Sequence, residues 1–274
     1  MPRKIITNQL KQEIKDYYLS KPMSLKNVEE HFQLSHPTIS KILKDCPKYK
    51  KAKIKSPNLI ENYFESIDTE DKAYFLGLII SDGNIFQDNT YGRQSSISIT
   101  LDLNDEYILN AFKQAVKTTT IVGKDGRGCG TIAVRSDIMA NDLAKYGIVP
   151  RKSFVTYLPS ISNELMPHLI RGILDGDGSI QAKINEKTNK FSHYISFCGT
   201  HKLMEDIAIY CYNNLSLKKL PKVYDYKNRE LSEIKISNIK DMEIFGNWIY
   251  NNATIFLQRK YNIYLSFKEH YNLK

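Results

Sequence analysis

The stretches AYFLGLIISDGNI at residues 73–85 and HLIRGILDGDGSI at residues 168–180 decide the fold, because they repeat one pattern. Each is an apolar run interrupted by a glycine, and each ends in a small residue followed by Asp-Gly. Downstream of both, the sequence predicts a short strand, a longer alternating strand, a helix, two strands and a helix. The chain therefore contains an internal duplication, and each half predicts the element order αββαββα.

The longer strand after each repeated stretch alternates between apolar and polar residues. In RQSSISITLDL (93–103) the isoleucines and leucines fall on one face, and Gln, Ser and Thr fall on the other. FSHYISFCG (191–199) has the same alternation, with Phe and Ile on the inner face. A period of two is typical of a strand. Each half is therefore predicted to contain a half-buried sheet with a hydroxyl-rich outer face.

Both repeated stretches place a glycine inside a helix, Gly77 or Gly172, where glycine costs about 1 kcal/mol relative to alanine. A second small residue, Ser81 or Gly176, follows four positions later. Residues four apart share one helix face, so each helix has a face almost without side chains. We expect the two helices to pack there, backbone to backbone, about a pseudo-twofold axis.

Asp82 and Asp177 end the two repeated stretches, so this packing places both carboxylates together at the C-terminal ends of the paired helices. Two carboxylates held close together repel each other unless a cation lies between them. Oxygen-only ligation favours Mg²⁺, which keeps several waters and takes its remaining ligands from phosphate. The alternative is that both are solvated helix-end aspartates, but duplication of the whole block favours a paired site.

FLGLIISDG (75–83) and IRGILDGDG (170–178) resemble the paired signatures of the LAGLIDADG homing endonucleases, in the form where one chain carries both copies. The resemblance covers about residues 60–274 and implies an α/β (α+β) fold of two pseudo-symmetric repeats, whose sheets form a saddle over DNA. It implies a staggered double-strand cut by Mg²⁺-dependent phosphodiester hydrolysis, with metal bound by Asp82 and Asp177. Main-chain carbonyls of Ser81 and Gly176 are further implied ligands, and Mn²⁺ is expected to substitute for Mg²⁺.

The first signature departs from the family pattern at one position. Ile80 stands where the family often has an earlier acid, which the second copy keeps as Asp175. We expect this position to belong to helix-end structure and not to the chemistry. Its loss therefore affects the symmetry of the two copies more than the activity.

Two basic pairs match positions of basic residues in the family: Arg151 and Lys152 at the end of the first copy, and Arg259 and Lys260 at the end of the second. A cation near the scissile phosphate stabilises the charge that builds on phosphorus and orients the attacking water. We assign this catalytic role to Lys152 and Lys260, and DNA contact to both arginines. The alternative is that these pairs bind phosphates away from the cut.

The first 55 residues hold 13 Lys and Arg against 5 Asp and Glu, although the whole chain carries a net charge of only +9. Helical periodicity at residues 8–20 is followed by a short helix, the turn QLS (33–35) and the helix HPTISKILKDC (36–46). This order resembles a helix-turn-helix unit, whose second helix enters the major groove. Its outward residues suit base edges and phosphates: His36, Thr38, Ser40, Lys41 and Lys44. The alternative is a helical hairpin that serves packing only.

These features divide the chain into an all-α helix-turn-helix domain (1–46), a basic linker (47–60), a first repeat (61–160) and a second repeat (161–274). No apolar run approaches the roughly 20 residues that span a bilayer, and no secretory signal is visible. The four cysteines form no C-x-x-C pair, which indicates packed thiols in a reducing compartment. We expect an intracellular protein, cytoplasmic or nucleoid-associated, with an organelle as an open alternative.

Together these features predict a monomeric, site-specific DNA endonuclease that reads a long, pseudo-palindromic duplex site through its two sheets. Outward polar side chains are the candidates for reading the major groove: Gln94, Ser96, Ser98, Thr100, Arg135, Tyr194, Lys222, Tyr224 and Lys235. Two rival functions use the same fold, a non-cleaving transcription regulator and an intron RNA maturase. Both signature aspartates argue against the first, and the helix-turn-helix favours DNA over RNA.

Overall fold

A computed structural model describes residues 6–20, 25–46, 56–87, 94–150, 156–186, 189–227 and 230–273. The chain forms two compact units, Met1–Lys55 and Ser56–Lys274. The last residues of the predicted linker belong to the second unit, since the Ile60 N–H donates to the Val116 carbonyl at 3.0 Å. The second unit therefore begins at Ser56 and not at residue 61.

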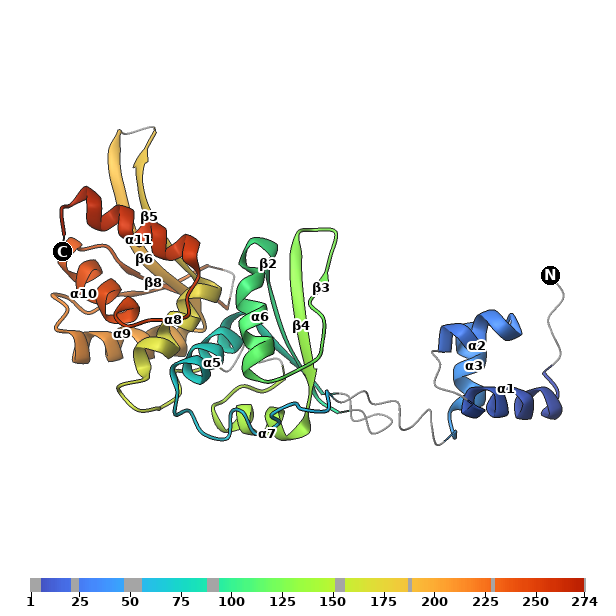
Figure 1. Cartoon of the computed structure of the whole chain (residues 1–274). Coiled ribbons are helices and arrows are strands. Elements are labelled where there is room, and N and C mark those ends of the chain that lie inside the picture. Colours follow the sequence, from blue (N-terminus) through green and yellow to red (C-terminus); the bar gives the residue numbers. More distant parts are fainter. Residues whose placement is uncertain are drawn as a thin grey trace. The chain divides into compact units, whose positions relative to one another are not determined.

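The described residues of the first unit form the helices α1 (Asn8–Ser20), α2 (Leu25–Phe32) and α3 (His36–Leu43) (Figure 1). Their apolar faces meet in a small core of Ile14, Tyr18, Val28, Ile39, Leu43 and Cys46. Gln33, in the turn between α2 and α3, has a left-handed φ of 53°. Pro37 lies in the first turn of α3, where a backbone N–H has no helical partner to lose. The helices and the turn lie where the sequence predicts them, and DNA contact by α3 stays a prediction.

The first repeat begins the second unit. Its elements are α5 (Glu70–Asp82), β1 (Gly83–Phe86), β2 (Ser96–Asp102), the 3₁₀ turn η2 (Leu103–Asp105), α6 (Glu106–Ala115), β3 (Gly123–Lys124), β4 (Cys129–Arg135) and α7 (Asp137–Lys145). The side chain of Ser136 accepts the Met139 N–H and so caps α7. All strand pairs are antiparallel, and the strand order is β1-β2-β4-β3.

The second repeat has the same order of elements. They are α8 (Met166–Asp177), β5 (Gly178–Asn185), β6 (Lys190–Gly199), α9 (His201–Leu215), β7 (Val223–Asp225), β8 (Ser232–Ile236) and α10 (Ile239–Tyr250), followed by a closing helix α11 (Gln258–His270). Its antiparallel sheet has the order β5-β6-β8-β7, which is that of the first sheet. The predicted duplication and the element order αββαββα are thus confirmed.

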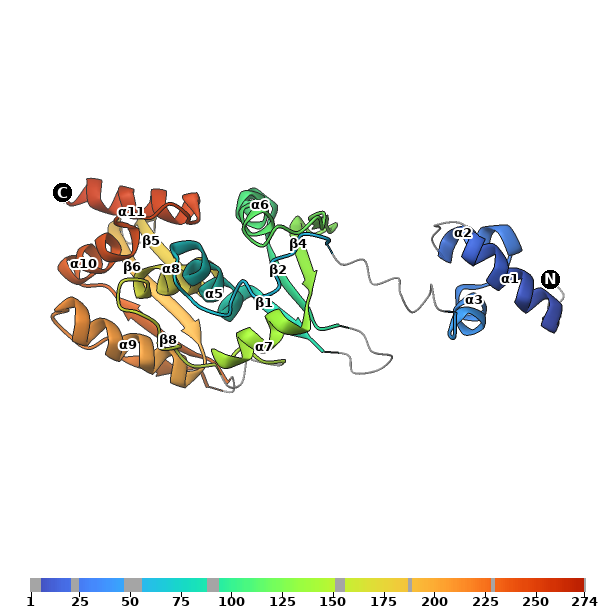
Figure 2. The same ribbon diagram turned by 60° about the horizontal axis from the view of Figure 1, so that its bottom comes forward.

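α5 and α8 pack side by side at the centre of the second unit, with one sheet on either side of the pair (Figures 1 and 2). The first sheet presents alternate residues to the core: Ile97 and Ile99 are fully buried, whereas Thr100 is exposed. This alternation is the one that the sequence predicts. None of the helices in the described parts of the chain is long and apolar enough to cross a membrane.

Candidate active site

α5 and α8 approach each other along their glycine-containing faces. A Cβ atom on Gly77 would clash with the Leu169 carbonyl oxygen and lie 3.0 Å from the Ile173 nitrogen. A Cβ atom on Gly172 would likewise clash with the Tyr74 carbonyl oxygen. Both obstacles are backbone atoms, which cannot move aside as a flexible side chain can. The two helices therefore touch backbone to backbone, which only glycine allows.

The close approach continues to the C-terminal ends of both helices. A Cβ atom on Gly176 would clash with Ser81 and lie 3.0 Å from the Asp82 Oδ2 atom. The Asp82 carboxylate of α5 thus lies against the end of α8, beside the residue that precedes Asp177. Asp82 is half-buried and Asp177 is exposed, so both are within reach of a ligand from solvent. The two sequence-predicted acids are therefore the last residues of two helices that meet at this point.

Negative charge gathers where the two helices end. Helix C-termini carry a partial negative charge, and here two of them meet, each with an aspartate as its last residue. The donor set is carboxylate and main-chain carbonyl oxygen, which is the set that Mg²⁺ prefers. Within the described residues, no group of three or more His, Cys, Asp or Glu side chains could hold a metal. The two aspartates and the neighbouring main-chain carbonyls have the oxygen chemistry of a hard divalent ion that would complete its shell with water or phosphate.

Lys260 lies behind this site and not on its surface. Its ammonium donates to the carbonyls of Leu174, Asp175 and Gly178 at 2.6–2.7 Å, and only 4% of the residue is exposed. Burial lowers the pKa of Lys260 to about 8, and the charge of Asp175 opposes this shift. The sequence predicts an ammonium that faces the scissile phosphate, whereas here it lies on the carbonyls at the end of α8. Its catalytic role stays a prediction.

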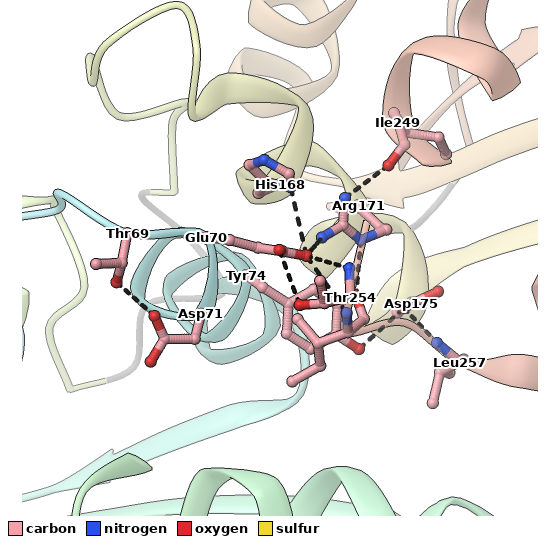
Figure 3. Close-up of polar contacts among 11 residues, drawn as sticks. Thr69, Glu70, Asp71, Tyr74, His168, Arg171, Asp175, Ile249, Thr254 and Leu257 are labelled. Atoms are coloured by element: carbon pink, nitrogen blue, oxygen red, sulfur yellow. Dashed lines mark hydrogen bonds and ion pairs between the residues drawn. The ribbon is translucent and has the colours of Figure 1, made fainter. Parts of the chain in front are cut away.

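Asp175 is a fully buried carboxylate between the two helices (Figure 3). Its Oδ2 atom accepts the Tyr74 hydroxyl at 2.9 Å and the Leu257 N–H at 2.8 Å. Burial raises the pKa of Asp175, and the charge of Lys260 opposes this rise. Asp175 therefore joins α5, α8 and the start of α11, as expected for a position that belongs to helix-end structure.

Arg171 forms a second buried contact between the repeats, and it was missed at the sequence level. Its guanidinium lies 2.7 Å from Glu70 Oε1 of α5 and donates to the carbonyls of Ile249 and Ile255 (Figure 3). Glu70 also accepts the Thr254 N–H at 2.7 Å. A basic residue in the apolar first half of the signature is the one sequence signal that could have pointed to it. Arg171 is 0% exposed and ties α8 to α5 and to the loop before α11.

Of the remaining basic candidates, the structure describes Arg259. The Arg259 Nε atom donates to Asp105 Oδ2 at 2.9 Å, so this arginine joins the second repeat to a buried aspartate of the first. About half of its side chain stays exposed, and its contact with DNA stays a prediction. Arg151 and Lys152 lie outside the described residues.

The sheet residues predicted to read DNA are all accessible. Exposed are Thr100, Arg135, Lys222, Tyr224 and Lys235, and half-buried are Gln94, Ser96, Ser98 and Tyr194. On the second sheet, the Lys235 ammonium lies 4.3 Å from the centre of the Tyr194 ring. Lys222 lies 5.1 Å from the centre of the Tyr224 ring. Both lysines and Tyr224 line a hollow of about 450 Å³, so ammonium groups and an aromatic ring border the same space.

The predicted recognition residues of α3 are also accessible. His36, Lys41 and Lys44 are exposed, and Thr38 and Ser40 are half-buried. The Nδ1 atom of His36 lies 2.6 Å from Glu29 Oε1, so this ring is held against α2. The two lysines are the cations that α3 presents to solvent.

Comparison with known proteins bears on the fold. No family profile and no curated protein matches the sequence. The meganuclease I-SmaMI bound to uncleaveable DNA matches with a TM-score of 0.51 at 15% identity, over 74% of this chain and 89% of that chain. I-SmaMI bound to cleaved DNA gives 0.50 at 14% identity, over 74% and 89%. The LAGLIDADG homing endonuclease I-GzeII in complex with its DNA target gives 0.52 at 14% identity, over 74% and 89%. The chain therefore has the fold of the LAGLIDADG homing endonucleases.

Proposed function

We propose that the chain is a site-specific DNA endonuclease that makes a staggered double-strand break by divalent-metal-dependent hydrolysis of phosphodiester bonds. The observation that carries this proposal is the backbone-to-backbone packing of α5 and α8, which places the Asp82 carboxylate against Gly176, the residue before Asp177. Neither repeat could build this pair of acids alone. The likeness to DNA-bound endonucleases supports the proposal through the fold.

Asp82 and Asp177 would hold Mg²⁺, or Mn²⁺ in its place, together with the main-chain carbonyls of Ser81 and Gly176. Bound there, the ion supplies Lewis acidity at the scissile phosphate and lowers the pKa of a bound water. The chain's own part is to hold the two carboxylates at a fixed separation and to bind the duplex across them. Lys152 is the proposed surface cation of the site, and Lys260 acts from behind it.

The two sheets would read the target in adjacent stretches of the major groove. Hydroxyl, amide and ammonium groups on their outer faces suit base edges and phosphates. The two repeats share a topology but not their outward residues, so the preferred target is an imperfect palindrome. The basic first unit would add contacts through α3 and lengthen the footprint. One chain carries both halves, so we expect a monomer to cut.

The test is unbiased selection of cleaved sites from a randomised DNA library, with the full chain and Mg²⁺. We expect one long preferred site, staggered ends when the termini are mapped, and cutting with Mn²⁺ as well. Asp82→Asn and Asp177→Asn should each abolish cutting while duplex binding is retained, and Glu269→Gln, an exposed carboxylate near the end of α11, is the control.

The proposal fails if the wild-type chain cuts no sequence with either metal. Tight binding to one duplex without cutting would then favour the transcription regulator. Preference for a folded intron transcript over duplex DNA would favour the maturase.

A further inference from the structure

The outer face of the second sheet carries a carboxylate beside a lysine. Glu233 and Lys235 lie two residues apart on β8, and Ile234 between them is fully buried, so both side chains leave the sheet on the face away from the core. The Lys235 ammonium lies 3.7 Å from Glu233 Oε1, and both residues line the hollow of about 450 Å³ on this face. A negative and a positive group therefore lie next to each other on the surface that is proposed to meet DNA.

Each of the two groups is also held from another side. The Tyr226 hydroxyl donates to Glu233 Oε2 at 3.0 Å, whereas Lys235 lies nearer to Oε1. The Lys235 ammonium lies 4.3 Å from the centre of the Tyr194 ring, which attracts cations. Only 19% of the Glu233 side chain is exposed. Both groups are thereby placed before a ligand arrives, which reduces the entropy lost on binding.

The corresponding positions of the first sheet hold uncharged side chains. The strand registers place Thr131 and Ala133 of β4 where β8 has Glu233 and Lys235. The Thr131 hydroxyl lies 2.8 Å from the Thr100 hydroxyl, so it already has a neighbour within its own sheet. The two sheets therefore present different chemistry at this position, and the charged pair serves one half of the target.

A carboxylate on a surface that meets DNA is unfavourable by itself. Phosphates repel it, and it makes the lysine beside it less available to phosphates. The pair therefore adds little attraction to the DNA backbone. Base edges differ, because cytosine and adenine expose amino groups in the major groove. An ionised carboxylate only accepts hydrogen bonds, so it selects a base with an amino group.

The order of donors and acceptors across a base pair decides between cytosine and adenine. In a C·G pair the cytosine amino group lies next to guanine, whose O6 and N7 atoms are both acceptors for an ammonium. In an A·T pair the carboxylate would lie beside adenine N7, which is another acceptor, and the ammonium would find a single acceptor, thymine O4, beside a methyl group. A C·G pair with cytosine toward the carboxylate therefore suits both side chains best.

We propose that Glu233 and Lys235 together read one C·G base pair in the half of the target that the second sheet binds. The Glu233 carboxylate accepts from the cytosine amino group, and the Lys235 ammonium donates to guanine. This inference rests on the proposed function only in that the sheet binds duplex DNA, and it does not require cutting. Glu233 determines which sequence is bound and opposes binding to other sequences.

The decisive variant exchanges the two charges and carries Glu233→Lys together with Lys235→Glu. Binding selection of the full chain from a randomised duplex library, without divalent metal, gives the preferred base at each position. At one position of one half-site, the wild type should prefer C over G by on the order of 10- to 100-fold. The exchanged variant should prefer G over C at that position and keep the other preferences. A role in folding alone cannot reverse the preferred base.

A single substitution, Glu233→Gln, gives a second readout. Glutamine suits the N6 and N7 atoms of adenine, so discrimination between C and A at this position should be lost. Unrelated duplex DNA should bind about 2-fold more tightly or better, because a repulsive charge is removed and Lys235 is free to contact a phosphate. Glu205→Gln is the matched control, because Glu205 lies 3.8 Å from Lys202 on α9, whose buried residues pack into the core. It should change neither quantity.

The outcomes separate this inference from the proposed cleavage. The same base preference in the wild type and the exchanged variant would overturn the inference, and so would an A·T preference at the position that the exchange alters. If the exchanged variant binds no duplex, unchanged discrimination between C and A in Glu233→Gln would overturn it. A wild type that binds one site without cutting refutes the endonuclease, and the same selection still decides the inference. A wild type without any preferred duplex refutes both.

Discussion

Replacement of Gly172 by alanine tests the contact on which the paired acids depend. The new methyl group would clash with the Tyr74 carbonyl oxygen and lie 2.8 Å from the Leu78 nitrogen. Overpacking destabilises a protein by typically 1–3 kcal/mol. Because the atoms in the way are backbone atoms, which cannot move aside, we expect a cost of about 3 kcal/mol here. The higher helix propensity of alanine offsets about 1 kcal/mol of this cost. The free energy of unfolding should therefore fall by about 2 kcal/mol.

Thermal unfolding of the full chain measures this loss. For a domain of about 150–250 residues, 1 kcal/mol corresponds to about 2–4 °C, so the Tm of the second unit should fall by about 4–8 °C. Gly126→Ala is the matched control, because a Cβ atom there meets nothing within 4 Å. Its effect should stay within about 0.5 kcal/mol, as for other surface substitutions.

DNA cleavage gives the second readout of the same substitution. Separation of α5 from α8 by part of an ångström moves Asp82 away from Asp177, and we expect cleavage to slow by on the order of 10-fold or more. A Gly172→Ala protein that melts and cuts like the wild type would refute the reasoning. It would show that the helices do not touch through their backbones.

Three further predictions concern other contacts. Arg171→Met removes the cation beside Glu70, which keeps its hydrogen bonds from Thr254, and removes the donor to two carbonyls. Urea unfolding should therefore show a loss of about 3 kcal/mol, against about 0.5 kcal/mol or less for the exposed Arg127→Met. Burial lowers the pKa of His168 in the native state. Below the pKa of the unfolded state, about 6.5, the unfolded chain therefore binds more protons than the native chain. The free energy of unfolding should fall as the pH drops through about 6.5, and it should fall less in His168→Gln. Lys41→Ala and Lys44→Ala together should weaken target binding. The slope of the logarithm of the binding constant against the logarithm of the salt concentration should fall by the amount expected for up to about two lost phosphate contacts, as measured by titration at several salt concentrations.

The arrangement of the central helices could be predicted because its signal is local and repeated. A glycine inside a helix is unfavourable unless a close approach requires it. Gly77 and Gly172 stand at the same distance from Asp-Gly in both copies, which links them to one shared contact. The alternation of the strands was equally readable, because a half-buried sheet imposes a period of two.

The buried polar contacts could not be predicted, because each joins residues that are far apart in sequence. Glu70 meets Arg171 across 101 positions and Thr254 across 184. No local pattern selects that carboxylate among the many in the chain. The role of Lys260 was hidden for a related reason: a lysine next to an arginine looks the same whether it faces DNA or a helix end. The path of the chain from α10 to α11 decides between them.

The two copies can differ at the position of Asp175 because one chain carries both of them. In a symmetric dimer every substitution appears on both sides of the axis. A carboxylate at the position of Asp175 would then be buried twice in one small interface, and each copy would need its own buried cation, because an unpaired buried charge is costly. In this chain Ile80 fills the position that corresponds to Asp175, so only one of these two positions holds a buried carboxylate. Gene duplication thus permits the two central helices to differ at a position where a symmetric assembly must repeat the same residue.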